Sequence, residues 1–118
     1  MVDDEQDITF TLKATLEENG LFQVETFTDP ALALFEFKAG VYDLAVLDIR
    51  MPVMNGFELC IKLREIDDRL RMCFLTPADL LYYHETDPDI IRGLGKGCFV
   101  PKPVNNEYFL EKIEAILS

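Results

Sequence analysis

Five polar side chains stand at or just after the ends of short apolar segments. Carboxylates, a hydroxyl and an ammonium are all groups that can act on a charged substrate. Because the carboxyl ends of parallel strands meet at one edge of a sheet, we expect such side chains to converge there. The five residues are Asp3, Asp4, Asp48, Thr76 and Lys102.

This set of residue types favours one chemistry. Three carboxylates in a partly dry pocket repel one another, and a divalent cation would relieve that repulsion. Oxygen ligands with positions left for water suit Mg²⁺ best. A carboxylate beside a cation, a lysine and a hydroxyl is arranged to accept a phosphoryl group, a reaction that depends on positioning and charge stabilisation. We therefore predict that Asp48 is a nucleophile that forms an acyl phosphate.

The elements that must position these residues alternate between helical and strand patterns. This alternation predicts an α/β fold in which a doubly wound parallel sheet carries helices on both faces. Residues 77–97 are the least regular part, with room for one short helix near Leu80–His84. The other predicted helices lie within residues 7–20, 28–40, 54–66 and 105–117, and the predicted strands are 22–27, 44–47, 72–75 and 98–100.

Length and charge exclude several function classes. The 118 residues suit one domain, and 22 acidic against 11 basic residues give a net charge of −11. Such a chain repels nucleic acid and anionic membranes, so direct binding to either is not expected. No signal peptide or membrane-spanning run is present, which predicts a soluble, cytoplasmic protein. Cys60, Cys73 and Cys98 fit neither a disulfide framework nor a zinc site, and we predict core thiols.

Four segments together resemble the receiver domain of two-component response regulators. They are VDDE (2–5), LAVLDIRMPVMNGFEL (44–59), FLT (74–76) and FVPKPV (99–104). The resemblance covers essentially the whole chain, so we expect one receiver domain over residues 1–118. It implies a flavodoxin-like sheet of five strands in the order 2-1-3-4-5, with the first strand truncated.

The resemblance also implies roles around a cation. Asp48 would be the phosphoacceptor. Asp4 and Asp48 would bind Mg²⁺ directly, the backbone carbonyl of Arg50 would be a third ligand, and Asp3 would act mainly through water. Such a domain would take its phosphoryl group from a histidine kinase or a phosphotransfer protein, and it would signal to a downstream protein or effector domain.

Further roles implied by the resemblance concern the response to phosphorylation. Lys102, ahead of a cis bond to Pro103, would pair with the phosphoryl oxygens, and Thr76 would donate to them in the active state. Phe99 stands at the aromatic switch position, which turns inward as Thr76 moves. The resulting change in the face formed by residues 76–106 would alter partner binding, with a homodimer as one option for the run Leu80–Tyr83.

The chain departs from the receiver pattern at three places. Only Met1 and Val2 precede the acidic pair, where a first strand is expected. Upstream residues, a very short strand with compensation, or a segment from another protomer would each account for this, and we favour upstream residues. Pro77 follows Thr76 and would restrict its movement. Arg50 and Ala78 occupy the places that tune access of water, which predicts slow autodephosphorylation.

Other interpretations stay open from the residues alone. A degenerate receiver would use the same fold as an interaction module that works without phosphorylation. An aspartyl phosphatase would need a second acid where Arg50 stands, and a dinucleotide site would need a glycine-rich loop. His84 is expected to be a solvated loop residue, and Asn55-Gly56 is expected to form only a turn.

Overall fold

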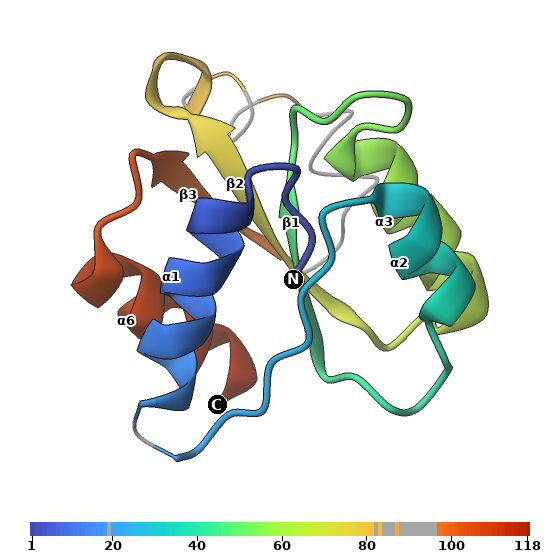
Figure 1. Cartoon of the computed structure of the whole chain (residues 1–118), viewed down its shortest axis with the longest axis horizontal. Helices are drawn as coiled ribbons and strands as arrows, with labels where there is room; N and C mark the ends of the chain where they lie inside the picture. The colour runs from blue at the N-terminus through green and yellow to red at the C-terminus, as the bar shows by residue number, and fades with distance from the viewer. Residues whose placement is uncertain (19, 82, 84–86, 88–96) are drawn as a thin grey trace.

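The computed structural model describes residues 1–18, 20–81, 83, 87 and 97–118, which form an α/β fold (Figure 1). His84 and most of the irregular segment predicted at 77–97 lie outside these residues. In chain order the elements are α1 (Gln6–Glu17), α2 (Pro30–Glu36), β1 (Leu44–Asp48), α3 (Gly56–Ile66), β2 (Arg71–Pro77), the 3₁₀ helix η1 (Ala78–Leu80), β3 (Gly97–Lys102) and α6 (Asn106–Leu117).

The sheet consists of three parallel strands in the order β1-β2-β3. Val2 adds isolated parallel bridges to Phe27 on one side and to Leu47 on the other. The predicted five-stranded sheet is therefore found as three strands plus these bridges. Residues 22–27 pair with Met1 and Val2 through the Phe27 bridge and the bond from the Met1 amine to the Glu25 carbonyl, which do not make a continuous ladder.

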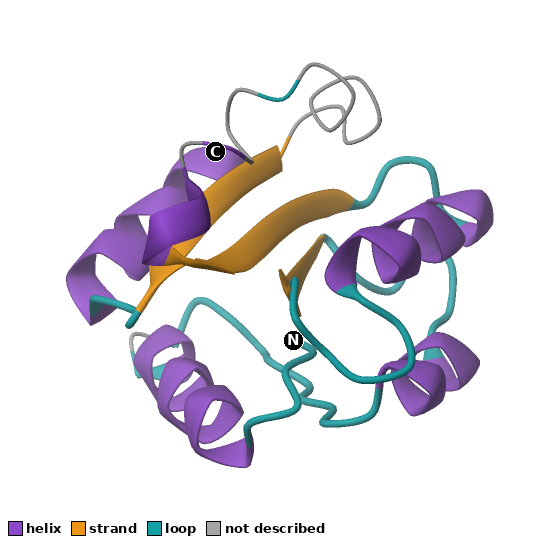
Figure 2. Cartoon of the chain, turned by 90° about the horizontal axis from the view of Figure 1, so that it is seen from above, coloured by secondary structure: helices purple, strands orange, loops and turns teal. Residues whose placement is uncertain are grey.

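Helices cover both faces of the sheet, as predicted. Figure 2 shows α1 and α6 on one face and α2 and α3 on the other. Successive strand side chains point to opposite faces, so the core divides into two clusters. Leu47, Phe74 and Phe99 belong to the cluster beneath α2 and α3, whereas Val46 and Val100 belong to the cluster beneath α1 and α6.

Local capping explains where the helices begin. The Asp29 side chain accepts a hydrogen bond from Ala31 N–H, and Asn105 accepts from Tyr108 N–H, each at the start of a helix. The helix predicted within 28–40 ends at Glu36, because the next residue is extended. Each helix that the structure describes is too short or too polar to span a lipid bilayer.

Two smaller predictions can also be compared with the structure. Cys60 and Cys73 are buried, Cys98 is half-buried, and all three are free thiols, as expected for core cysteines. In the run Leu80–Tyr83, Leu81 packs against the core and Tyr83 is exposed. Tyr82 lies outside the described residues.

Candidate functional site

Two backbone hydrogen bonds place the acidic pair beside the end of β1. Val2 N–H donates to the Val46 carbonyl over 2.8 Å, and Asp48 N–H donates to the Val2 carbonyl over 2.9 Å. Asp3 follows at once, and its Oδ1 accepts a hydrogen bond of 2.9 Å from Glu5 N–H, which leads the chain into α1. A first strand reduced to Val2 is therefore enough to bring Asp3 next to Asp48.

Asp48 is held by the loop that follows it. Its Oδ1 lies 3.4 Å from Arg50 N–H, and Gly56 N–H donates to the Ile49 carbonyl over 3.0 Å. A Cβ on Gly56 would lie 2.5 Å from the Asp48 carbonyl oxygen, so only glycine fits there without movement. Asn55 forms a capping box with Glu58 at the start of α3. The interpretation of Asn55-Gly56 as only a turn was wrong, because both residues build the helix start behind Asp48.

Lys102 reaches the same place from the end of β3. Its Nζ lies 3.0 Å from Asp3 Oδ2 and 3.2 Å from Asp48 Oδ1. Glu5 Oε1 is 3.6 Å away, at the solvent side. The Lys102–Pro103 peptide bond is cis, as the resemblance implied. One ammonium therefore faces two buried carboxylates and one exposed carboxylate.

The acids form a group that fits a divalent cation. One carboxylate oxygen each from Asp3, Asp4 and Asp48 lies within 4.8 Å of the others. Asp3 and Asp48 are buried, whereas Asp4 is exposed, so the group opens to solvent on one side. Asp3 Oδ2 is fully buried and pairs with the Lys102 ammonium at 3.0 Å. A set of carboxylate oxygens with a side open to water suits Mg²⁺.

Burial and neighbouring charges shift the pKa values of Asp48 and Lys102. Burial, and then the charge of Asp3, raises the pKa of Asp48 to about 7, although Lys102 and the Arg50 N–H act in the opposite direction. Burial lowers the pKa of Lys102, but hydrogen bonds and charges from Asp3 and Asp48 outweigh burial and raise it overall. Asp48 therefore gains a proton near neutral pH, while Lys102 keeps its charge.

Thr76 and Phe99, for which the resemblance implies a switch role, lie close to this edge. Thr76 is fully buried, one residue beyond the position in β2 that pairs with Asp48. The Phe99 ring is also buried and stacks on Phe74, with ring centres 5.5 Å apart. Phe57 completes the cluster, 5.1 Å from Phe74 and 6.5 Å from Phe99.

The structure brings together the acids, Thr76 and Lys102 that the sequence predicted. The Arg50 carbonyl as a third ligand stays a prediction. Sequence reasoning missed Glu5, although an acid directly after the Asp3-Asp4 pair was a visible signal. It also missed Phe57, whose place in the aromatic cluster depends on how α3 packs on the sheet.

Comparisons with known proteins agree with this geometry. The model of the response regulator receiver domain family matches residues 1–114. The response regulator MprA of Mycobacterium leprae is 33% identical over 118 residues, covering 98% of this chain and 49% of that protein. The nisin biosynthesis regulatory protein NisR of Lactococcus lactis is 32% identical over 117 residues, covering 98% and 48%. The chain spans about half the length of these curated relatives.

Solved structures give the same result. The non-phosphorylated HemR receiver domain of Leptospira biflexa has a TM-score of 0.83 and 31% identity, covering 99% of this chain and 90% of that one. A receiver domain protein of Methanospirillum hungatei has a TM-score of 0.82 and 28% identity, covering 98% and 89%. Family model, relatives and fold agree, and the chain belongs to the response regulator receiver domain family of two-component systems.

Proposed function

We propose that this domain accepts a phosphoryl group on Asp48 from a histidine kinase or a phosphotransfer protein. The observation that carries the proposal is the position of Lys102 Nζ, 3.2 Å from Asp48 Oδ1, beside the Asp3-Asp4 pair. A lysine fixed at this distance can hold a phosphoryl oxygen at the moment of transfer.

In the transfer step, a carboxylate oxygen of Asp48 attacks the phosphorus of the donor's phosphohistidine. The P–N bond breaks, its electron pair returns to the imidazole, and an acyl phosphate forms on Asp48. Lys102 neutralises charge on the transferred oxygens. Mg²⁺, held by Asp4, Asp48 and the Arg50 carbonyl with Asp3 acting through water, would supply further positive charge.

The protonation of Asp48 links this reaction to pH. With a pKa of about 7, the carboxyl is largely protonated in mildly acidic solution when no cation is bound. A protonated carboxyl is a poor nucleophile, so the site works best when positive charge keeps Asp48 ionised. This dependence favours a phosphoacceptor that requires Mg²⁺.

The output would be a changed protein-binding face. A phosphoryl group on Asp48 would attract the Thr76 hydroxyl, which contacts the Pro77 carbonyl at 3.5 Å in this structure. Thr76 and Phe99 lie on neighbouring strands, so a movement of Thr76 would change the position of Phe99. A downstream protein or an effector domain would respond to that shift.

The test is intact-mass spectrometry after treatment with phosphoramidate, with and without Mg²⁺. We expect one added phosphoryl group in the presence of Mg²⁺ and none in Asp48→Asn. Asp68→Asn, which changes an exposed acid outside the site, should behave as the wild type. Incorporation that survives Asp48→Asn would overturn the assignment of Asp48. No incorporation in the wild type would favour a degenerate receiver instead.

We further propose slow autodephosphorylation. Arg50 is exposed next to Asp48 and would shield an acyl phosphate, and Ala78 has no group that orients water. Replacing Ala78 with Gln, which can position a water molecule, should shorten the lifetime of the phosphorylated protein several-fold. Loss of the phosphoryl group from the wild type within seconds would contradict this proposal.

A further inference from the structure

Two of the three cysteines meet on one face of the sheet. Cys73 lies within β2 and Cys98 near the start of β3, and the two residues are direct partners in the parallel ladder. Cys73 belongs to the apolar cluster on the face that α1 and α6 cover, and Cys98 packs against that cluster (Figure 2). A hydrogen bond joins the two thiols. The sheet therefore holds two sulfur atoms in contact.

The spacing of the two strands permits a covalent bond between these sulfur atoms. Neighbouring strands lie about 4.8 Å apart, a value inside the range of about 4.4–6.8 Å that Cα atoms of disulfide-bonded cysteines adopt. Partner side chains of a parallel pair run side by side, whereas a relaxed disulfide brings the two Cβ atoms to about 3.5–4.5 Å. A disulfide here would form under strain, and strained disulfides are easily reduced again.

The surroundings make Cys98 the more reactive of the two thiols. Cys98 is half-buried, whereas Cys73 is buried. The hydrogen bond from the Cys73 thiol lowers the pKa of Cys98; burial opposes this effect, and the charge of Lys112 adds to it. The same hydrogen bond, together with burial, raises the pKa of Cys73 well above its ordinary value. Because the thiolate is the nucleophilic form of cysteine, reaction should begin at Cys98.

Cys60 provides an internal comparison. It is buried in α3 and belongs to the core cluster on the opposite face of the sheet. Burial raises the pKa of its thiol, although the charge of Arg64 acts in the opposite direction. Cys60 is therefore held in the protonated form, and we expect it to be unreactive.

We propose that Cys98 and Cys73 form an oxidation site that hydrogen peroxide converts into a reversible disulfide. The Cys98 thiolate attacks one oxygen of the peroxide, the O–O bond breaks, and Cys98 becomes a sulfenic acid. The hydroxide that leaves takes up the proton that Cys98 lost. The Cys73 sulfur then attacks the Cys98 sulfur, the S–O bond breaks, and the hydroxyl group leaves as water with the Cys73 proton. One peroxide is reduced to two water molecules, and two thiols are oxidised to one disulfide.

The burial of the pair explains why a small oxidant is required. Cys98 is only partly accessible and Cys73 is buried, so a bulky disulfide such as oxidised glutathione has little room to approach either sulfur. The product would tie β2, which carries Thr76, to β3, which ends at Lys102. The chemistry of the thiols does not depend on phosphate transfer to Asp48, so the two proposals can fail separately.

The test is mass spectrometry of tryptic peptides after treatment of the 118-residue chain with excess hydrogen peroxide. Catalase then removes the peroxide, and N-ethylmaleimide in guanidinium chloride blocks the free thiols. Cleavage after lysine and arginine, except before proline, places the cysteines on separate peptides, 51–62, 72–92 and 97–112. We expect 72–92 and 97–112 to be joined and 51–62 to carry a blocked thiol. Dithiothreitol, added before blocking, should separate the joined peptides.

Variants identify the attacking thiol. In Cys73→Ser the sulfenic acid on Cys98 lacks its partner thiol, so dimedone should label Cys98. In Cys98→Ser, Cys73 should stay reduced and unlabelled. Cys60→Ser is the matched control, because it removes a buried thiol from the other core cluster, and it should form the disulfide as the wild type does.

Four results would overturn the proposal, and the first two come from the wild type, so they do not depend on how a variant folds. The first is blocked thiols on both 72–92 and 97–112 after peroxide treatment. The second is a cross-link that occurs only in a covalent dimer. The third is dimedone labelling of Cys73 in Cys98→Ser, and the fourth is oxidation of Cys60 as fast as that of Cys98.

Discussion

The two ends of this sheet differ in how completely the chain fills them. At the carboxyl end, Lys102 lies within 3.2 Å of both buried carboxylates, and Gly56 packs against the Asp48 backbone without room for a methyl group. At the amino end, a cavity of about 450 Å³ separates residues 20–25 from the start of β1. Val2 lies between the two regions and is bonded to both neighbours.

This difference directs attention to Val2, whose backbone bonds position Asp3. Val2 N–H donates to the Val46 carbonyl, and Asp48 N–H donates to the Val2 carbonyl, at the place where the chain continues into Asp3. We expect the edge that carries the acids and the amino end of the sheet to respond separately to substitution. Substitutions at each end can test that separation.

The largest effect is expected for Val2→Pro, which removes the N–H that donates to the Val46 carbonyl. Unfolding free energy should fall by about 3 kcal/mol, and the increase in melting temperature that we expect on addition of Mg²⁺ should disappear. Val2→Ala keeps the N–H and should cost only about 1–2 kcal/mol through lost apolar burial. Equal losses from both variants, measured by urea unfolding, would show that the backbone bond does not hold the acidic pair.

Gly56→Ala should disturb the carboxyl end alone. The new methyl group would lie 2.5 Å from the Asp48 carbonyl oxygen, so helix α3 or the Asp48 loop must shift, at a cost of about 2 kcal/mol. Incorporation of phosphate from phosphoramidate should fall in parallel.

The matched control is Gly40→Ala. A side chain at Gly40 would strain the backbone, because φ is 77° there. Unlike at Gly56, no atom lies within 4 Å of an added Cβ. It should lose about 1 kcal/mol of stability and accept phosphate normally. A normal rate of phosphorylation in Gly56→Ala would contradict the importance of this close approach.

A smaller effect concerns pH. The pKa of Asp48 is about 7 in the folded chain against an ordinary 3.8, so on raising the pH the unfolded chain releases this proton first. The free energy of unfolding should therefore fall as the pH rises from 3.8 to about 7. Asp48→Asn should remove that fall. At pH 8 its free energy of unfolding should exceed that of the wild type by on the order of 1 kcal/mol, allowing for solvent screening. Urea unfolding in EDTA measures it, with Asp68→Asn as the control, and a less stable Asp48→Asn at pH 8 would refute it.

The smallest effect is expected at Val53, in the loop after Asp48. This residue is 96% exposed and has a φ of 72°, a conformation that β-branched residues rarely adopt. Val53→Asn should raise the unfolding free energy by about 0.5–1 kcal/mol, because Asn tolerates this region better. An unchanged thermal midpoint would mean that the loop relaxes at no cost.

Most residues of the site could be predicted from the sequence, because functional side chains in parallel sheets lie at the carboxyl ends of the strands. Asp48, Thr76 and Lys102 each come at the end of an apolar run, and Val2 places the acidic pair at the same edge. The predicted strand at 22–27 was not found as a strand, because its pairing depends on distant residues. Alternation of side chains reveals a preference for extended structure, but it cannot supply the neighbour that completes a ladder.

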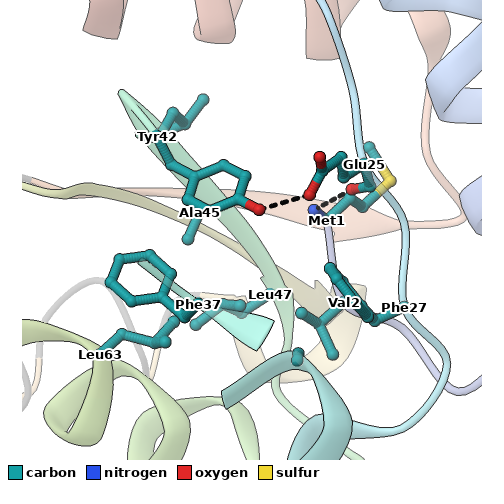
Figure 3. A pocket seen from close by; sticks show the side chains of 11 residues that line it. Met1, Val2, Glu25, Phe27, Phe37, Tyr42, Ala45, Leu47 and Leu63 are labelled. Carbon is teal, nitrogen blue, oxygen red and sulfur yellow. Dashed lines mark hydrogen bonds between the residues drawn. The ribbon is translucent and has the colours of Figure 1, made fainter. Parts of the chain in front are cut away.

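The hydrogen bond from Tyr42 to Glu25 (Figure 3) makes Tyr42 an optical reporter in a chain that has four tyrosines and no tryptophan. The hydrogen bond to Glu25, together with burial and negative charge, raises the pKa of Tyr42 to about 12. A spectrophotometric titration should therefore contain a late tyrosinate component, and Glu25→Gln should shift that component to lower pH. Ultraviolet absorbance could then register events at the amino end of the sheet without an added dye.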